Sequence, residues 1–268
     1  MNILETIIAQ KKKEIEEKKK YINIDPFKLI NTDFDRKCLS LKEKLLNGEA
    51  NIITEFKRKS PSKGWINENI HISEVVPEYE AHGAAAISVL TDKEFFGGNI
   101  EELRMARLEV EIPLLRKDFM IDEFQLYEAK SYGADVILLI AACLTKEQTK
   151  KLAKKAKELN LEVLLEIHSK EEVEYICDEV DIIGINNRDL ETFITDIKTS
   201  MHLIEFMPAD KPVISESGIN DIETILTLQH VGFKGFLIGE TFMKANNPAI
   251  AFADFMKVLK GKSKLIQQ

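Results

Sequence analysis

From residue 51 to residue 240 the sequence alternates short runs of β-branched and apolar residues with longer amphipathic runs. Eight runs are predicted to be strands, in chain order 51–57, 84–90, 113–119, 135–141, 162–168, 181–186, 212–217 and 235–240. Amphipathic stretches that predict helices include 100–110, 123–133, 146–160, 170–180 and 222–232. Because no linker divides these units, they predict an α/β fold, a closed (β/α)8 TIM barrel rather than an open doubly wound sheet.

We expect the 268 residues to form a single domain, since barrels of this length commonly fold as one unit. Ile3, Leu4, Ile7 and Ile8 fall at helical spacing, which predicts an additional N-terminal helix that lays one apolar stripe on the barrel. The Lys/Glu run that follows suits the solvated face of that helix. The expected parts are an N-terminal helical extension, the barrel and a polar, frayed tail, at residues 1–48, 49–262 and 263–268.

Composition argues against several classes of protein. Lys plus Arg total 37 against 45 Asp plus Glu, and a formal net charge of -8 predicts no nucleic-acid partner, even with the basic run KRKSPSK at 57–63. No apolar run approaches the roughly 20 residues of a membrane span, and the amino terminus lacks the apolar core of a signal peptide. We therefore expect no membrane partner and a cytoplasmic location.

Metal and cofactor chemistry have no motif in the sequence. Cys38, Cys143 and Cys177 lack the paired spacing of a zinc site and are interpreted as reduced thiols. The five histidines show no metal-ligand spacing, and His168 beside Glu166 is interpreted as a loop or helix-start residue. Since no glycine-rich nucleotide loop is found either, we predict a site with no metal and no cofactor.

Most of the predicted strands end in polar residues, and the carboxyl ends of barrel strands are where active sites form. Glu55 and Lys57 end the first strand, Lys117 ends the third and Glu166 ends the fifth. Such side chains are rarely buried unless they are paired, so their convergence in one barrel mouth predicts acid–base chemistry on a carbonyl or an alcohol. For any one strand, the alternative is an ordinary charged loop residue.

The first strand, NIITEFK, shows this pattern most clearly. Successive side chains of a strand point to opposite faces, so Ile53, Glu55 and Lys57 share one face. We interpret that face as the inside of the barrel, with Ile53 deep in the packed interior and the two charges at its rim. The two charged side chains should then lie near Lys117 and Glu166 and not in solvent.

The loops after the last two predicted strands indicate a phosphate site. SESGIN precedes a helix expected to begin near Ile219, and LIGETFM includes the end of the eighth strand. Both place small residues where backbone N–H groups can converge on an anion, and in barrels these two loops often bind phosphate. Gly218 and Gly239 would admit a phosphate to the backbone, which favours a phosphorylated small molecule as the substrate.

Beyond these patterns, the sequence closely resembles one family, the indole-3-glycerol phosphate synthases. The similar segments run in family order over nearly the whole chain: ILETIIAQKKKEI, EFKRKSPSKG, AAAISVLTDKEFFGG, PLLRKDF, FQLYEAKSYGADVILLIAACL, LLEIHSKEE, GINNRDLETF, ISESGI and FLIGETFM. The resemblance implies a carboxy-lyase of tryptophan biosynthesis. Its reaction closes the ring of 1-(2-carboxyphenylamino)-1-deoxyribulose 5-phosphate to give indole-3-glycerol phosphate, with loss of carbon dioxide and water.

The resemblance also implies roles for individual residues. Lys117 resembles the general acid that protonates the substrate carbonyl. Glu166 resembles the group that handles the proton of dehydration, with Glu55 and Asn186 placed to assist. The implied substrate contacts are Lys57 and Arg188 at the carboxylate, Phe96 and Phe119 around the aromatic ring, and Ser60, Ser217, Gly218, Gly239 and the backbone N–H of Glu240 at the sugar and phosphate.

Several points stay open at the level of the sequence. Asn99 departs from the family pattern and is expected to cap a helix, whereas Trp65 could close over the substrate or pack on the barrel rim. Residue types alone also allow a sugar-phosphate isomerase, a Schiff-base aldolase or a barrel that only binds a phosphorylated ligand. Because solvated helix faces offer no apolar patch, we expect a monomer, with a weak dimer as the alternative.

Overall fold

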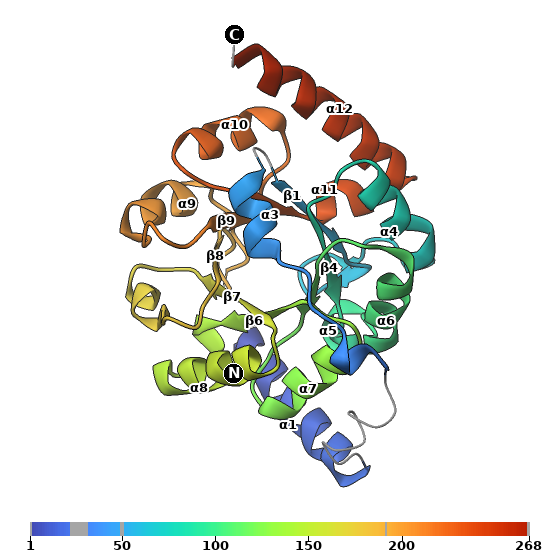
Figure 1. The fold of residues 1–268 in the computed structure, drawn as a ribbon, viewed down its shortest axis with the longest axis vertical. Coiled ribbons are helices and arrows are strands. Elements are labelled where there is room, and N and C mark those ends of the chain that lie inside the picture. Colours follow the sequence, from blue (N-terminus) through green and yellow to red (C-terminus); the bar gives the residue numbers. More distant parts are fainter. Residues whose placement is uncertain (1, 22–31, 49–50, 191, 267–268) are drawn as a thin grey trace.

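In the computed structural model, which describes residues 2–21, 32–48, 51–190 and 192–266, parallel strands close into a barrel (Figure 1). The barrel strands are β1 (Asn51–Phe56), β4 (Ala86–Leu90), β5 (Leu114–Lys117), β6 (Val136–Ile140), β7 (Glu162–Ile167), β8 (Ile182–Asn186), β9 (Val213–Glu216) and β10 (Gly235–Ile238). Their order around the barrel follows the chain, and β1 pairs with both β4 and β10 to complete the circle. The predicted (β/α)8 TIM barrel is confirmed, and each predicted strand is present.

Helices surround the barrel, except for α3, which lies across one of its ends (Figure 1). The helices are α1 (Ile3–Tyr21), α3 (Leu41–Asn47), α4 (Ile72–Ala81), α5 (Lys93–Phe96), α6 (Ile100–Glu109), α7 (Glu123–Ser131), α8 (Lys146–Glu158), α9 (Lys198–Leu203), α10 (Ile222–His230), α11 (Glu240–Met243) and α12 (Pro248–Ile266). Short 3-10 helices form at η1 (Thr32–Asp35), η2 (Ala141–Cys143), η3 (Glu171–Tyr175) and η4 (Ile204–Phe206). In the loop after β1, β2 (Lys59–Ser60) pairs with β3 (Gly64–Trp65) in a small antiparallel hairpin.

The region after β7 differs from its prediction. Residues 170–180 were expected to form an amphipathic helix, but only the single 3-10 turn η3 is present. There the carboxylate of Glu172 turns back toward β7 and accepts the backbone N–H of His168 at 2.6 Å. A side chain that bonds the preceding loop in this way competes with a regular helix start, so this part of the chain stays irregular.

Side-chain caps set where several helices begin. Asn99 accepts the backbone N–H of Glu101 at 3.1 Å, so the predicted cap of α6 is confirmed. Asp221 caps α10 by accepting the backbone N–H of Thr224 at 2.8 Å. As a result α10 begins at Ile222, and the prediction of a start near residue 219 is wrong.

The barrel interior is packed with apolar side chains below a polar rim. Ile53 of β1 and Leu164 of β7 belong to one buried cluster, which confirms the inward direction predicted for Ile53. Leu41 and Leu45 of α3 join this cluster, and Leu45 packs on Gly235 at the start of β10. Helix α3 therefore closes the barrel at the amino ends of the strands and leaves the carboxyl ends for the polar residues.

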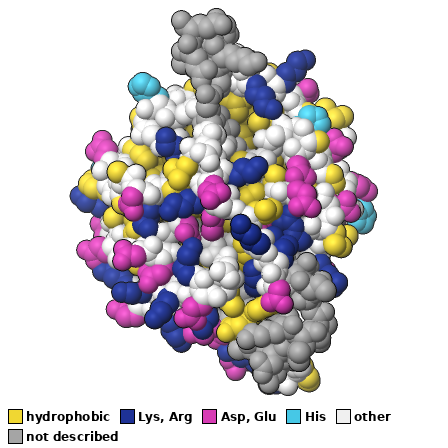
Figure 2. Space-filling model, viewed as in Figure 1, with side chains coloured by type: hydrophobic (Ala, Val, Ile, Leu, Met, Phe, Trp, Pro, Cys, Tyr) yellow, Lys and Arg dark blue, Asp and Glu magenta, His cyan; other side chains and the backbone are white. Residues whose placement is uncertain are grey.

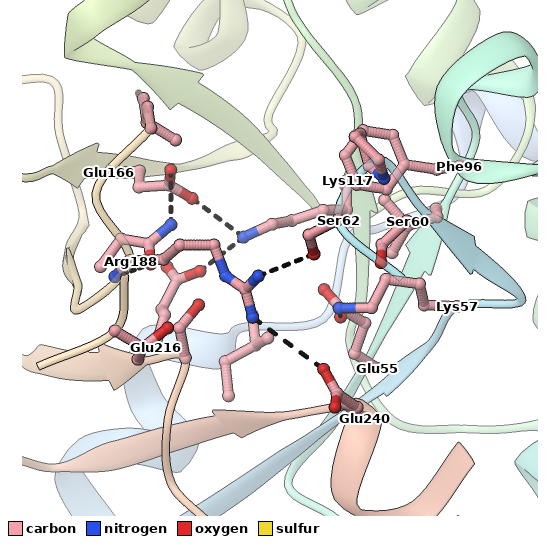
Figure 3. A pocket seen from close by; sticks show the side chains of 18 of the residues that line it. Glu55, Lys57, Ser60, Ser62, Phe96, Lys117, Glu166, Arg188, Glu216 and Glu240 are labelled. Carbon is pink, nitrogen blue, oxygen red and sulfur yellow. Dashed lines mark hydrogen bonds and ion pairs between the residues drawn. The ribbon is translucent and has the colours of Figure 1, made fainter. Parts of the chain in front are cut away.

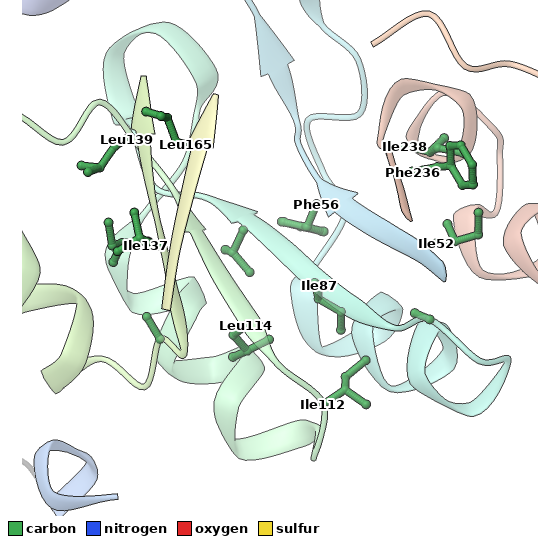
Figure 4. Packing of buried hydrophobic residues seen from close by; sticks show 14 of the residues in the cluster. Ile52, Phe56, Ile87, Ile112, Leu114, Ile137, Leu139, Leu165, Phe236 and Ile238 are labelled. Carbon is green, nitrogen blue, oxygen red and sulfur yellow. The ribbon is translucent and has the colours of Figure 1, made fainter. Parts of the chain in front are cut away.

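A second and larger cluster fills the space between the strands and the surrounding helices (Figure 4). Ile52 and Phe56 of β1 point into it, on the face opposite to Ile53 and Glu55. Val76 of α4 packs in the same cluster. Side chains along β1 thus point alternately into the barrel and out toward the helices, as the sequence NIITEFK predicted.

The terminal helices complete the body. Of the stripe predicted on α1, Ile7 is buried and Ile3, Leu4 and Ile8 are half-buried. Lys11 and Ile15, which follow on the same helix, are buried as well. At the other end α12 stays helical to Ile266, past residue 262 where we expected the barrel to end, and residues 267 and 268 lie outside the described residues.

Charged side chains of both signs are interspersed over the surface seen in Figure 2. Ion pairs join neighbouring elements, such as Lys19 of α1 with Asp122 before α7 at 2.7 Å. In the parts of the chain that the structure describes, no helix is both long and apolar enough to cross a membrane.

Candidate active site

A cavity of about 430 Å³ opens at the carboxyl ends of the barrel strands (Figure 3). Every candidate site residue from the sequence lines it: Glu55, Lys57, Ser60, Phe96, Lys117, Phe119, Glu166, Asn186, Arg188, Ser217, Gly218, Gly239 and Glu240. These residues come from seven different strand ends or the loops that follow them. The fold therefore brings together in one place the whole set of residues named from the sequence.

Lys117 lies at the centre of the charged part of this cavity. Its ammonium Nζ is 3.0 Å from Oε2 of Glu166, and it also forms an ion pair with Oε2 of Glu216 (Figure 3). Burial alone would lower the pKa of Lys117, but the negative charges of Glu166, Glu216 and Glu55 raise it above its usual value. Lys117 is therefore an ammonium ion at neutral pH, held between two carboxylates.

Glu55 and Lys57 form a second ion pair at the end of β1, which β4 separates from β5 (Figure 3). Both side chains are largely removed from solvent, and Glu55 is close enough to Lys117 to raise its pKa. Gly239 makes room for this carboxylate, because a Cβ at that position would lie 2.5 Å from Oε1 of Glu55. The prediction that both charges lie in the mouth is confirmed, and Glu55 is the one that lies near Lys117.

Glu166 is surrounded by hydrogen-bond donors and cations. Besides Lys117 on Oε2, its Oε1 accepts the side-chain amide of Asn186 at 3.0 Å and lies 3.2 Å from Nε2 of His168. Burial would raise the pKa of Glu166, but Lys117, His168 and Asn186 together hold it well below its usual range. Glu166 thus stays ionised and is a weak proton acceptor in the unliganded site.

Glu216 is the residue of this site that was not singled out from the sequence. It ends β9, is 1% exposed, and its Oε1 has no hydrogen-bond partner among the described residues. Burial first, and then the charges of Glu166 and Glu55, outweigh the pairing with Lys117 and raise its pKa to about 7. A signal for it existed in Gly184 of β8, since a glycine inside a strand marks a close approach, and a Cβ there would meet Oε1 of Glu216.

One wall of the cavity is apolar. The rings of Phe96 and Phe119 lie 6.0 Å apart between centroids, and Leu138 and Ile140 of β6 continue this wall. A set of residues from the first turns of α1 also lines the cavity, namely Ile3, Leu4 and Ile7. The sequence placed the apolar stripe of α1 on the barrel but did not show that its first turns reach the site.

The opposite wall consists of the loops after β9 and β10. Ser217 and Gly218 both adopt left-handed backbone conformations, with φ of 66° and 74°. Gly239 precedes α11, whose first N–H groups have no partner within a helix. The hydroxyl of Ser60, in β2, is also buried without a partner among the described residues. These groups offer hydrogen-bond donors to an anion on this side of the site.

Arg188 reaches across the mouth of the cavity (Figure 3). Its guanidinium donates to the hydroxyl of Ser62 at 2.9 Å and lies 3.9 Å from the carboxylate of Glu240. Trp65, by contrast, is 49% exposed and packs against Gly97, with the ammonium of Lys59 5.6 Å from its ring centroid. Trp65 thus packs on the rim in this structure and is outside the lining of the cavity.

The thiols of Cys38, Cys143 and Cys177 are free. Within residues 2–21, 32–48, 51–190 and 192–266, no group of three or more His, Cys, Asp or Glu side chains is placed to hold a metal ion. The chemistry that the described residues themselves offer is that of lysine and carboxylate groups acting on a bound small molecule.

Comparison with known proteins assigns the family. The model of the family described as indole-3-glycerol phosphate synthase matches residues 4–255. The indole-3-glycerol phosphate synthase of Bacteroides thetaiotaomicron is 49% identical over 259 residues, which cover 97% of this chain and 99% of that protein. The enzyme of the same name from Caldanaerobacter subterraneus subsp. tengcongensis is 44% identical over 261 residues, with the same coverage of 97% and 99%.

Solved structures support the fold independently of sequence. The 3-hexulose-6-phosphate synthase from Salmonella typhimurium superposes with a TM-score of 0.61 at 13% identity, covering 79% of this chain and 99% of that one. A tryptophan synthase chain from Pyrococcus furiosus gives a TM-score of 0.58 at 14% identity, with 79% and 98% covered. At such low identity these two structures support the barrel fold alone. From the family model and the close relatives, the chain belongs to the indole-3-glycerol phosphate synthase family and is an enzyme of the carboxy-lyase class.

Proposed function

We propose that the protein closes the ring of 1-(2-carboxyphenylamino)-1-deoxyribulose 5-phosphate to indole-3-glycerol phosphate by acid–base catalysis with lysine and glutamate. The observation that carries this proposal is the Lys117 ammonium, held between Glu166 and Glu216 beside an apolar wall. A reaction that protonates a carbonyl next to an aromatic ring needs this combination. Written for the carboxylate form of the substrate, the reaction takes up one proton overall.

Lys117 acts as the general acid in this scheme. As the aromatic carbon that carries the carboxylate attacks the carbonyl carbon, Lys117 gives its proton to the carbonyl oxygen. The bond to the carboxylate then breaks, carbon dioxide leaves, and its electron pair restores the aromatic ring. A pKa raised by neighbouring carboxylates keeps Lys117 charged until the oxygen becomes basic in the transition state.

In the dehydration that follows, we assign the proton-accepting role to Glu216 and not to Glu166, for which the resemblance implied it, because the pKa of Glu166 is held low. Lys117 regains a proton from solvent and donates it to the new hydroxyl, which leaves as water, and a base removes a proton from the methylene carbon next to the nitrogen. Glu216 suits the role of base because its pKa lies near 7 and one of its oxygens is unpartnered among the described residues. Glu166 stays ionised, orients Lys117 together with Asn186, and balances the positive charge that develops on the nitrogen.

The remaining residues hold the substrate across the cavity. Phe96 and Phe119 enclose the aromatic ring, and Lys57, kept in place by Glu55, binds the carboxylate together with Arg188. The phosphate lies at the opposite wall. The groups proposed to contact the sugar and the phosphate are Ser60, Ser217, Gly218, Gly239 and the backbone N–H of Glu240. This arrangement separates the apolar and the anionic ends of one phosphorylated substrate.

A Schiff-base aldolase is disfavoured by the electrostatics of Lys117. A lysine that attacks a carbonyl must lose its proton, and the three nearby carboxylates oppose that loss. The test is to incubate the purified protein with the carboxyphenylamino-deoxyribulose phosphate and to follow indole fluorescence. Folded protein that forms no indole would contradict the proposal, and a lysine adduct trapped by borohydride would favour the aldolase.

A further inference from the structure

A second cavity of about 510 Å³ lies beside the first. Asn186 and Arg188 line both cavities, whereas His168 and Glu172 line only the second among the described residues. Glu166 is on the other side, in the lining of the first cavity. His168 therefore lies in the wall between the two spaces, behind the carboxylate of Glu166.

The ring of His168 bridges two carboxylates. Its Nε2 lies 3.2 Å from Oε1 of Glu166, as an ion pair without the direction of a good hydrogen bond, and its Nδ1 lies 3.3 Å from Oε2 of Glu172. The same oxygen of Glu172 accepts the backbone N–H of His168 at 2.6 Å. Glu172 thus fixes both the backbone and the ring, and this places one ring nitrogen at the back of Glu166.

The two oxygens of Glu166 face different partners. Oε2 faces Lys117 inside the first cavity, while Oε1 faces Asn186 and His168. Without His168, only the amide of Asn186 would hold Oε1, and the carboxylate could more easily rotate toward the substrate or share the proton of Glu216. A cation behind it opposes both changes.

We propose that His168 is a positioning residue for the ring-closure reaction, which holds Glu166 ionised and directed at Lys117 while Glu172 fixes the imidazolium ring. This role rests on the proposed function and deepens it, because His168 acts through Glu166 and not on the substrate. Burial would lower the pKa of His168, but Glu166 and Glu172 raise it to about 10, so the ring carries its charge at neutral pH.

Other charged or titratable groups lie around His168 and Glu166 on the neighbouring elements. They are Lys117 of β5, Cys143 of η2, Glu172 of η3, Arg188, Asp189 and Asp196 after β8, and Glu216 of β9. Removing the imidazolium takes one positive charge from a cluster in which Glu166 and Glu216 share Lys117. Glu166 and Glu216 together lose one proton near pH 7. Without the imidazolium they should hold this proton more tightly, so that it leaves at a higher pH.

The test compares pH profiles of kcat for the wild type, His168→Gln and Glu172→Gln. We expect His168→Gln to lower kcat at pH 7 roughly tenfold and to leave KM within about twofold. The rise of kcat with pH near 7, the acid limb of the profile, should move to a pH about one unit higher. Glu172→Gln keeps the ring but removes a negative charge beside it, so it should shift this limb in the opposite direction and by less. His202→Gln, on the exposed face of α9, is the matched control and should leave the profile unchanged.

An unshifted limb in both variants would overturn the proposal, even if activity falls, because a purely structural role lowers kcat without moving the profile. If His168→Gln does not fold, Glu172→Gln decides by the same criterion. Titration of His168 by NMR in the unliganded protein separates this proposal from the proposed function. A ring still charged at pH 8 that titrates at lower pH in Glu166→Gln supports the bridge, whether or not the wild type forms indole. A ring that titrates near 6.5 in the wild type contradicts the bridge.

Discussion

The ammonium of Lys11 on α1 lies 2.9 Å from Oδ1 of Asp118, the residue that follows Lys117 at the end of β5. Lys11 is 1% exposed and also lies 2.9 Å from Asp92, the residue that caps α5. Oδ2 of Asp118 accepts from Thr91 at 2.7 Å. The N-terminal helix is therefore joined by a buried charge network to the two strand ends that carry the apolar wall and the general acid.

We expect Lys11→Met to destabilise the protein by about 3 kcal/mol, because it leaves Asp92 and Asp118 buried with less compensating charge. Urea unfolding followed by circular dichroism measures the change. Lys12→Met is the matched control, since Lys12 is the exposed neighbour on the same helix, and its midpoint should stay close to that of the wild type. Equal midpoints for the two variants would show that the network contributes little.

Lys117→Ala should lower kcat by at least about a thousandfold, because the variant lacks the proton donor for the carbonyl oxygen. Binding that depends on the phosphate should change little, since the phosphate lies at the opposite wall. Steady-state rates and titration with inorganic phosphate measure the two effects. Lys117→Arg keeps the positive charge but cannot release a proton readily, so it should also be inactive. Near-normal turnover in either variant would refute the role of Lys117.

The pH dependence of kcat should show an acid limb set by Glu216. Its pKa is about 7, so below pH 7 the carboxyl is protonated and cannot accept the methylene proton. Turnover should therefore rise as the pH increases through 7. Glu216→Gln should lower kcat by roughly a hundredfold or more and remove this limb. If the limb persists in Glu216→Gln, another group sets it.

The same residue should limit stability at high pH. The folded state raises the pKa of Glu216 from 4.5 to about 7, so it holds the proton more tightly than the unfolded chain. The stabilisation from this proton is complete below pH 4.5 and is lost as the pH rises through 7. At pH 8, Glu216→Gln should be more stable than the wild type by roughly 1–3 kcal/mol, in thermal or urea unfolding.

Glu166→Gln is the matched comparison, because its native pKa is shifted in the opposite direction. Its stabilisation is present above pH 4.5 and lost in acid, so the amide should be less stable than the wild type at pH 8. A change of stability in the same direction for both variants at pH 8 would contradict the opposite pKa shifts of Glu166 and Glu216.

Gly218→Ala should mainly raise KM, by about tenfold or more, with kcat within about threefold. Gly218 has a φ of 74°, and a Cβ there would lie 2.5 Å from a methyl carbon of Thr195, so the loop proposed to bind phosphate must shift. Gly232→Ala is the control, with a φ of 115° and no atom within 4 Å of its Cβ. Gly232→Ala should lower the free energy of unfolding through backbone strain and leave KM unchanged. A lower kcat with unchanged KM in Gly218→Ala would argue against the phosphate loop.

Much of the site could be predicted because its residues stand at strand ends. Glu55, Lys117 and Glu166 lie in the last residues of strands that the local pattern identifies, and Lys57 directly follows one. A closed parallel barrel brings all such ends to one mouth. The partners within that mouth were harder to predict. Glu216 is 99 positions from Lys117 in the sequence. It directly precedes Ser217 and Gly218, which the sequence pattern indicates as an anion site, so Glu216 itself was not considered.

The sequence by itself determined the barrel, the inward face of β1 and the set of residues at the mouth, because strand alternation and helical periodicity are local properties of the chain. Only the tertiary structure decided which charges meet: Lys117 between two glutamates, Lys11 under Asp118, and His168 behind Glu166. The physical reason is that these pairings, and the burial that shifts the pKa of each group, depend on how distant segments approach one another once the barrel has closed.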